Sequence, residues 1–153
     1  MARRDTSMTA SEVAETLAEA RNLQVATLDL DGWPHLTTLW FTVLDGLVTF
    51  RSFRKSRRIG NLERDPRITV LAELGHGYDE LRGVMIQGRA RLVSDEDVVL
   101  DVYAAVLARM QGVPADRATA EALFGRFAGK NTVVQVEPVR IVSWDHRKLG
   151  GAY

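Results

Sequence analysis

A short run of basic residues is the part of this sequence whose residue types and spacing most directly suggest chemistry. Residues 51–58 read RSFRKSRR and carry five cationic side chains within eight residues. The run crosses from the end of a predicted strand into a predicted helix that Ser56 can cap. A helix start already has a partial positive charge and unpaired N–H groups. Additional cations at this position are therefore unfavourable unless an anion binds among them.

A phosphate group would remove this conflict. It could contact the Ser56 hydroxyl, the N–H groups of the first helical turn and the guanidinium groups of Arg57 and Arg58. The alternative is a solvated basic surface whose cations pair with Glu63, Asp65 or a neighbouring subunit. Because the basic run coincides with a capped helix start, we favour phosphate binding.

Other ligand classes are less compatible with the sequence. The 20 basic and 20 acidic residues give no net charge, which argues against nucleic-acid binding, and Phe50 and Phe53 follow strand periodicity as predicted core residues. No Gly-x-x-x-x-Gly-Lys segment follows a predicted strand, and no Gly-x-Gly-x-x-Gly segment opens a helix. These absences exclude a P-loop and argue against a dinucleotide-binding fold of the usual kind.

The sequence provides no recognisable catalytic side chain or metal site. It contains no cysteine, and its three histidines, His35, His76 and His146, are far apart. No Gly-x-Ser-x-Gly segment presents a nucleophile. Trp40 is predicted to lie in the core, whereas Trp144, beside a polar tail, is the better candidate for contacting a ligand or another subunit. This pattern suits a protein whose chemistry is supplied by a bound cofactor.

The elements that would position the basic run are mainly strands. Hydrophobic periodicity and turn residues predict six strands, over residues 23–30, 33–44, 47–53, 67–74, 81–93 and 131–144. Asp31-Gly32 and Asp45-Gly46 are predicted hairpin turns, and Pro138 marks an edge or a bulge. Four helices are predicted: one after a Thr9–Glu12 capping box, one over 56–64, one capped by Ser94, and one over 116–128 that follows a break at residues 112–114. We therefore expect a mainly β fold, an antiparallel barrel with flanking helices.

Length and composition are consistent with that architecture. The chain has 153 residues, of which 46% are hydrophobic, enough to bury the core of a single domain spanning residues 1–153. Residues 1–8 are polar and are expected to be disordered. No signal peptide or membrane-spanning apolar run is recognised, so a cytoplasmic protein without membrane contact is expected.

Several segments together resemble the pyridoxamine 5′-phosphate oxidase-like superfamily. They are an Asp-Gly-x-Pro-His turn at residues 31–35, Ser-Arg-Arg at 56–58, Asn-Leu-x-Arg-Asp-Pro at 61–66 and Gly-x-Ala at 88–90. The similarity continues to residues 143–151, SWDHRKLGG, and so covers nearly the whole chain. The resemblance implies a six-stranded split β-barrel that binds FMN or the deazaflavin F420.

The resemblance also implies a cofactor site. Ser56, Arg57 and Arg58 would hold the cofactor phosphate, and Arg51 and Ser52 would flank the ring or the ribityl chain. The backbone of the second strand would face the polar edge of the ring, at Leu36, Thr37, Thr38 and Leu39. Arg54 and Lys55 would add positive surface for the longer anionic tail of F420. Family members are typically homodimers, so Trp144 and His146 of the partner subunit would close the site.

Two departures from the family pattern bear on the reaction. Gly83 stands near the place of a glutamine that contacts the flavin, and the C-terminal Arg-x-His pair is replaced by WDHR at residues 144–147. These departures argue against oxidation of vitamin B6, and the overall pattern is closer to the F420-binding branch. The expected activity is hydride transfer between F420 and a small planar unsaturated substrate. The alternatives are an FMN-dependent enzyme and a non-catalytic carrier of F420, flavin or haem.

Overall fold

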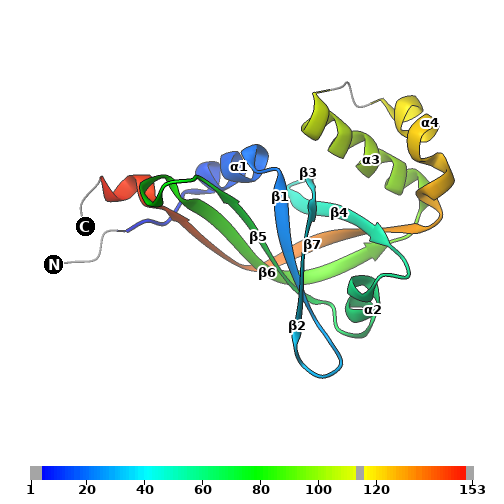
Figure 1. Ribbon diagram of the computed structural model, residues 1–153, viewed down its shortest axis with the longest axis horizontal. Coiled ribbons are helices and arrows are strands. Elements are labelled where there is room, and N and C mark those ends of the chain that lie inside the picture. The colour runs from blue at the N-terminus through cyan, green and yellow to red at the C-terminus, as the bar shows by residue number, and fades with distance from the viewer. Residues whose placement is uncertain (1–4, 113–115, 151–153) are drawn as a thin grey trace.

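A computed structural model describes residues 5–112 and 116–150 of the chain (Figure 1). Its strands are β1 (Asn22–Leu28), β2 (Pro34–Trp40), β3 (Thr42–Leu44), β4 (Leu47–Phe53), β5 (Arg67–Leu74), β6 (Arg82–Val93) and β7 (Asn131–Asp145). Its α-helices are α1 (Ala10–Glu19), α2 (Arg57–Arg64), α3 (Glu96–Gln111) and α4 (Arg117–Ala128). Two short 3₁₀ helices, η1 (Tyr78–Glu80) and η2 (His146–Leu149), complete the described elements.

The seven strands form one antiparallel sheet in the order β2-β1-β5-β6-β7-β4-β3. Its two edge strands, β2 and β3, follow one another in the chain and are separated only by Phe41. The sheet therefore curls, as Figure 1 shows, and its two edges are joined by the backbone. This is the split-barrel type of mainly β fold with flanking helices that the sequence predicted.

Two groups of buried side chains hold the elements together. The larger group fills the curled sheet beneath α1 and α2, and its biggest fully buried members are Phe41, Phe50, Leu23 and Ile59. The smaller group lies between α3, α4 and the sheet, around Val133 and Tyr103. Since α3 and α4 pack against each other over β4 and β7, they add a second layer on that part of the sheet (Figure 1).

The second predicted strand, over residues 33–44, is divided into two, so the sheet has seven strands rather than six. Phe41 and Thr42 are buried one after the other, which breaks the alternation of exposed and buried residues that a regular strand requires. The prediction that Trp40 lies in the core is wrong, because 54% of its surface is exposed. Phe53 is equally exposed, so its predicted core position is also wrong, whereas Phe50 is fully buried.

The helix starts agree with the predicted capping residues, with one exception. Thr9 forms the predicted capping box with Glu12, and Ser56 caps α2. α3, however, is capped by Asp95, whose carboxylate accepts hydrogen bonds from the backbone N–H groups of Asp97 and Val98. The Ser94 hydroxyl instead lies 3.0 Å from that of Thr132 on β7.

The predicted irregularity near Pro138 is a β-bulge between β6 and β7. Gln87 pairs with Arg140 and Gly88 pairs with Pro138, so Val139 has no opposite residue. A Cβ atom on Gly88 would lie 2.4 Å from the backbone oxygen of Glu137, which explains why glycine is needed at the bulge.

The two ends of the chain meet near the start of β6. The backbone N–H of Asp145 donates to the Thr6 oxygen at 2.8 Å, and the N–H of Met8 donates to the Ser143 hydroxyl at 3.0 Å. Residues 5–8 are thus hydrogen-bonded, contrary to the disorder expected for them, while residues 1–4 lie outside the described residues. So do residues 113–114, where the break between the last two helices was predicted. None of the described helices combines the length and hydrophobicity needed to cross a membrane.

Candidate functional site

The start of α2 carries a group of hydroxyls that face one another. Ser56 caps the helix, and its hydroxyl accepts a hydrogen bond from the backbone N–H of Ile59 at 3.3 Å. The hydroxyl of Ser52, at the end of β4, lies 3.0 Å from that of Ser56. The first turn of α2 contains no acidic residue. The positive end of the helix is therefore not neutralised locally.

Arg58 lies against these hydroxyls and joins them to β2. Its Nη1 donates to the Ser52 hydroxyl at 2.7 Å, its Nε donates to the Thr37 hydroxyl at 3.2 Å, and its Nη2 also donates to Thr37. We call Thr37, Ser52, Ser56 and Arg58 the hydroxyl–arginine cluster. It unites residues from β2, β4 and α2 that are up to 21 positions apart in the sequence.

The hydroxyl–arginine cluster has a positive charge without a matching negative one. Arg58 is half-buried, and burial lowers the pKa of its guanidinium group. Within residues 5–112 and 116–150 no carboxylate forms an ion pair with it, and its hydrogen-bond acceptors are neutral hydroxyls. A partly desolvated cation beside a helix N-terminus is stabilised by a bound anion. The residues present therefore fit a phosphate group.

Arg57, the next residue expected at the phosphate, has a different role. Its guanidinium forms a two-point ion pair with Asp29, with Nε–Oδ1 and Nη2–Oδ2 distances of 2.8 and 2.7 Å. Asn61 donates a further hydrogen bond to Asp29 at 2.8 Å. The Asn61 amide and the Arg57 guanidinium hold the pKa of the Asp29 carboxyl below its usual value.

The charge of Arg57 is thus matched within the chain. The pairing alternative considered for the basic run applies to this residue, but its partner is Asp29 rather than the predicted Glu63 or Asp65. Sequence reasoning missed Asp29 and Asn61, although the spacing of Arg57 and Asn61, four positions apart on α2, places both on one helix face.

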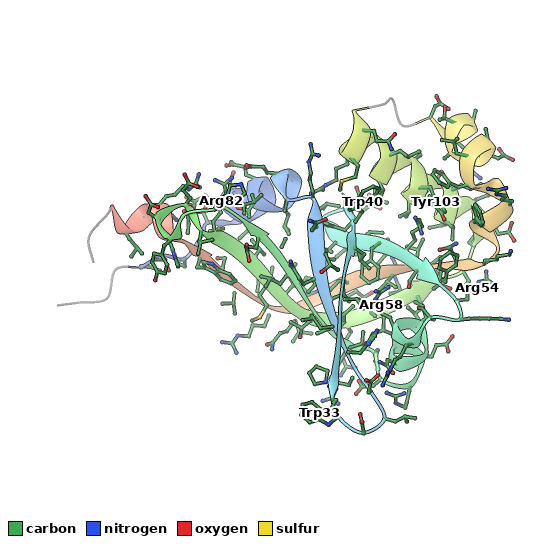
Figure 2. All side chains as sticks on the ribbon, viewed as in Figure 1. Trp33, Trp40, Arg54, Arg58, Arg82 and Tyr103 are labelled. Atoms are coloured by element: carbon green, nitrogen blue, oxygen red, sulfur yellow. The ribbon has the colours of Figure 1, made fainter. Side chains whose placement is uncertain are left out.

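Arg51 is directed away from the hydroxyl–arginine cluster. Successive residues of a strand point to opposite faces, so Arg51 and Ser52 cannot lie on the same face of β4. The Arg51 guanidinium lies 3.9 Å from the centre of the Tyr103 ring, which stacks on Phe124 at 4.3 Å. In Figure 2, Tyr103 lies beside α3, while Arg58 lies on the α2 side of β4. In this chain Arg51 therefore joins α3 and α4 to the sheet.

The backbone of β2 is predicted to face the cofactor ring, and this requires β2 to lie at an edge of the sheet. β2 pairs with β1 alone, from Leu28↔Pro34 to Asn22↔Trp40. In an antiparallel pair, alternate residues of an edge strand direct their N–H and C=O groups away from the partner. Residues 36–39 lie within this edge, and the Thr37 side chain already contacts Arg58. The strand thus offers free backbone groups next to the hydroxyl–arginine cluster.

A groove of about 620 Å³ lies on the other side of the turn between β4 and α2. It is lined by Phe53, Arg54, Lys55, Gly129 and Lys130, and we call it the basic groove. The Arg54 guanidinium is held at its wall by two backbone carbonyl groups, Asn131 O at 3.1 Å and Ser94 O at 2.7 Å (Figure 2). Carbonyl groups carry no net charge, so these contacts do not neutralise Arg54.

The basic groove adds one residue that the sequence did not single out. Lys130 reaches it because Phe53 at the end of β4 pairs with Asn131 at the start of β7. The backbone N–H of Arg54 also donates to the Lys130 oxygen at 2.9 Å. Only the strand pairing, which is non-local, brings residues 53–55 and 130 together.

Trp144 and His146 lie at the opposite end of the molecule. In Figure 1, η2, coloured red, and α2 are at opposite ends of the sheet. The Trp144 indole packs over Gly83, so closely that a Cβ atom on Gly83 would lie 2.3 Å from it. The His146 ring contacts Tyr78, and its Nδ1 lies 2.8 Å from the backbone oxygen of Tyr78. Within one chain these two residues are not brought to the hydroxyl–arginine cluster.

Across residues 5–112 and 116–150, no three His, Asp or Glu side chains gather closely enough to hold a metal ion. The candidate site consists of the hydroxyl–arginine cluster, the edge strand β2 and the basic groove.

Comparison with known proteins identifies the family to which the chain belongs. The family described as pyridoxamine 5′-phosphate oxidase matches residues 9–145. The crystal structure of the conserved hypothetical protein Rv2991 from Mycobacterium tuberculosis has 35% sequence identity and a TM-score of 0.90, covering 100% of this chain and 94% of that one. None of the curated proteins compared with the chain is significantly similar to it.

More distant solved structures share the fold. An F420 reductase has 18% identity and a TM-score of 0.64, with 84% of this chain and 94% of that chain covered. HutZ, the heme storage protein from Vibrio cholerae, has 17% identity and a TM-score of 0.64, with 88% and 94% covered. Because the family match spans most of the chain, the conclusion is direct: this chain belongs to the pyridoxamine 5′-phosphate oxidase family.

Proposed function

We propose that this chain is an oxidoreductase that uses the deazaflavin F420. The observation that carries the proposal is the unmatched positive charge of Arg58 in the hydroxyl–arginine cluster, next to the basic groove. A cofactor with a phosphate and a further anionic tail would place negative charge at both positions. FMN has the phosphate but lacks the tail.

The phosphate would be held by Arg58, Ser52 and Ser56. A guanidinium and two hydroxyls can donate several hydrogen bonds to phosphate oxygens, and the N–H groups at the start of α2 add the favourable helix dipole. On binding, Arg58 would exchange neutral hydroxyl acceptors for a charged one. Arg57 is left out of this assignment because Asp29 already occupies its guanidinium.

The anionic tail would follow the basic groove. Arg54, Lys55 and Lys130 supply three cationic side chains along it. The Phe53 ring, 54% exposed, provides an apolar wall at the same place. This surface is the structural reason for preferring F420 to FMN.

Bound F420 would supply a hydride donor and acceptor at the ring carbon that replaces N5 of flavin. The free backbone edge of β2, around residues 36–39, would orient the ring by hydrogen bonds to its polar side. A small planar unsaturated substrate would stack on the ring, where exclusion of water and alignment are the contributions of the protein.

A second copy of the chain would complete the site. Directly paired residues of neighbouring strands share a sheet face, so the registers place Thr38, Gln24, Leu71, Met85 and Val142 in one row. Leu36, Trp40 and Trp144 lie on the same face, and we call it the outer apolar face. Leu71, Met85, Val142 and Trp144 belong to neither buried core group.

Leu36 and Trp40 are 66% and 54% exposed. Large exposed apolar patches are typical of protein–protein contacts. Members of this family are commonly dimeric, and we propose that the outer apolar face is the dimer contact. The partner's Trp144 and His146 would then approach the ring.

Equilibrium titration with F420 and with FMN tests the cofactor assignment. The double variant Lys55→Ala/Lys130→Ala should weaken F420 binding and leave FMN affinity nearly unchanged, because only F420 reaches the basic groove. Equal effects on both cofactors would contradict the tail assignment.

Turnover of reduced F420 with a panel of quinones and enones separates an enzyme from a carrier such as a haem-storage protein. Tight binding with no turnover would reject the oxidoreductase proposal.

A further inference from the structure

A large groove lies away from the hydroxyl–arginine cluster. It is a groove of about 910 Å³ between α1, the β3–β4 hairpin and the second half of β7. We call it the α1 groove. Pockets of several hundred cubic ångströms accommodate small organic ligands.

One wall of the α1 groove is a helix face with small side chains. Ala10, Ala14 and Ala18 recur every four residues and therefore lie on one side of α1. They span a length of about 12 Å along the helix axis. Small side chains here leave room for a long, narrow ligand rather than for a bulky one.

The opposite wall is a strand edge that β4 does not cover. β4 pairs with residues 131–136 of β7, whereas β6 pairs with β7 from Val133 to Asp145. Residues 137–145 consequently have a strand on one side only. Ile141, 48% exposed, lines the groove on this edge, and Val48 and Val136 form part of its floor.

The charged residues of the α1 groove are of one sign. Arg109 from α3 and Arg140 from β7 line it, and none of the described lining residues is Asp or Glu. The whole chain has equal numbers of acidic and basic residues, 20 of each. The groove therefore combines an apolar interior with a net positive charge.

Arg109 is the better placed of the two cations. Its Nη2 donates to the backbone oxygens of Leu17 and Ala20 at the end of α1, and its guanidinium lies 4.3 Å from the centre of the Phe41 ring. Its buried Nε has no hydrogen-bond acceptor among the described residues. Burial lowers the pKa of this guanidinium, and no carboxylate in the described part of the chain pairs with it.

From these observations we propose that the α1 groove binds an amphipathic carboxylate with a linear apolar body. The carboxylate would pair with Arg109 at the C-terminal end of α1. The apolar body would run along the alanine face of α1 towards Met8. This site is separate from the proposed cofactor site and does not depend on the identity of the cofactor.

Isothermal titration calorimetry with decanoate, decanol and decylamine, each below its micelle concentration or solubility limit, tests the charge preference. Decanoate should bind at least about tenfold more tightly than decanol, because a charge-assisted hydrogen bond contributes about 1.5 kcal/mol or more. Decylamine should bind more weakly still. Equal affinities for the three probes, or no saturable binding of decanoate, would overturn the proposal.

Two variants locate the binding. Ala14→Phe fills the groove from an exposed position on α1 and should abolish decanoate binding without removing any contact of Arg109. Arg109→Met should lower the affinity for decanoate to that for decanol. If Arg109→Met fails to fold, Ala14→Phe decides alone, since unchanged decanoate binding in that variant rejects the site.

The other possible occupant of the α1 groove is a second copy of the chain. Analytical sedimentation of the wild type and of Ala14→Phe tests this by comparing their oligomeric states. The proposal expects the same oligomeric state for both proteins. Dissociation of an oligomer by Ala14→Phe would identify the groove as a subunit contact and reject the ligand.

Discussion

At the residue scale, neighbouring arginines of one basic run do different things. Among the described residues, the hydrogen-bond acceptors of Arg58 are neutral hydroxyls, while Arg57 is neutralised by Asp29. Arg54 is bound to two carbonyl groups, and Arg51 stacks on Tyr103. The charge of a cluster therefore says less about ligand binding than the partner of each side chain. Arg58 combines three features: it lacks a charged partner among the described residues, it is half-buried, and it lies at the start of α2. We therefore expect Arg58 to bind the phosphate.

Replacing the two adjacent arginines one at a time tests this distinction. Arg58→Ala should weaken cofactor binding by about 10- to 100-fold, because a charge-assisted hydrogen bond in a half-buried site is lost. Arg57→Ala, the matched control, should change the affinity by less than about threefold. Fluorescence titration with F420 measures both. The assignment fails when Arg57→Ala is as damaging as Arg58→Ala.

The Asp29 carboxyl gives a prediction for the dependence of stability on pH. Its pKa is lower in the folded chain than in the unfolded one, so the carboxylate stabilises the fold above a pH of about 4. That contribution is lost as the pH falls through the lower folded value. Asp29→Asn should therefore be less stable than the wild type at pH 7, and the difference should shrink in acid.

Urea denaturation at a series of pH values measures the Asp29 effect. Glu121→Gln, at an exposed carboxyl of α4, serves as the control and should follow the wild type. A stability difference between Asp29→Asn and the wild type that stays constant down to pH 3 would show that the carboxylate charge is not responsible.

At the element scale, β6 and β7 depend on close contacts that involve glycines. Gly83 pairs with Trp144, and its missing side chain makes room for the indole. The missing side chain of Gly88 likewise makes room for the backbone of Glu137 at the bulge. The space beside residue 83 is thus occupied by the Trp144 ring. A longer side chain at residue 83, such as glutamine, would require Trp144 to move.

Gly83→Ala should destabilise the fold by about 1–3 kcal/mol, because its Cβ would overlap the Trp144 ring. Gly60→Ala is the control: nothing lies within 4 Å of its added Cβ, and the helical position should gain about 0.5–1 kcal/mol. In a double-mutant cycle, Trp144→Ala should remove most of the penalty of Gly83→Ala. Strict additivity of the two substitutions would contradict the overlap.

Many of the helix starts and turns are predictable from the sequence, because they depend on residues that are close together in the chain. Thr9 and Ser56 mark helix starts, and Asp45-Gly46 adopts positive φ angles of 51° and 77° in its turn. The break at Phe41 is not local, since the ring is buried in the core and contacts Arg109 of a distant helix.

The partners of the arginines are equally non-local. Asp29 is 28 positions from Arg57, and Asn131 is 77 positions from Arg54. The sequence pattern predicts a phosphate at the start of α2. Our proposal of Arg58 rather than Arg57 rests on contacts between residues that are far apart in the sequence.

At the scale of the whole molecule, α2 begins at the hydroxyl–arginine cluster and η2 begins at His146. These two helices lie at opposite ends of the sheet, as Figure 1 shows. The outer apolar face extends between β2 and Trp144 across the sheet. A dimer through this face would both cover apolar surface and bring distant parts of two chains together. The fold is shared by relatives with different roles, so function must be argued from these surfaces.

The double variant Leu36→Asp/Trp40→Glu should convert a dimer into a monomer, because each change buries a charge in the apolar contact. Cofactor affinity should fall as well, since the partner's residues are lost. Leu123→Glu, at a position 54% exposed on α4, is the control and should remain dimeric. Analytical ultracentrifugation over a range of concentrations measures the outcome. A wild type that is monomeric at every concentration would reject this contact.

A crystal structure of the protein with F420 tests the central claim most directly. The cofactor phosphate should lie at the start of α2, within hydrogen-bond distance of Arg58 and Ser56, while Arg57 stays paired with Asp29. A phosphate bound elsewhere, with the hydroxyl–arginine cluster unchanged, would contradict it.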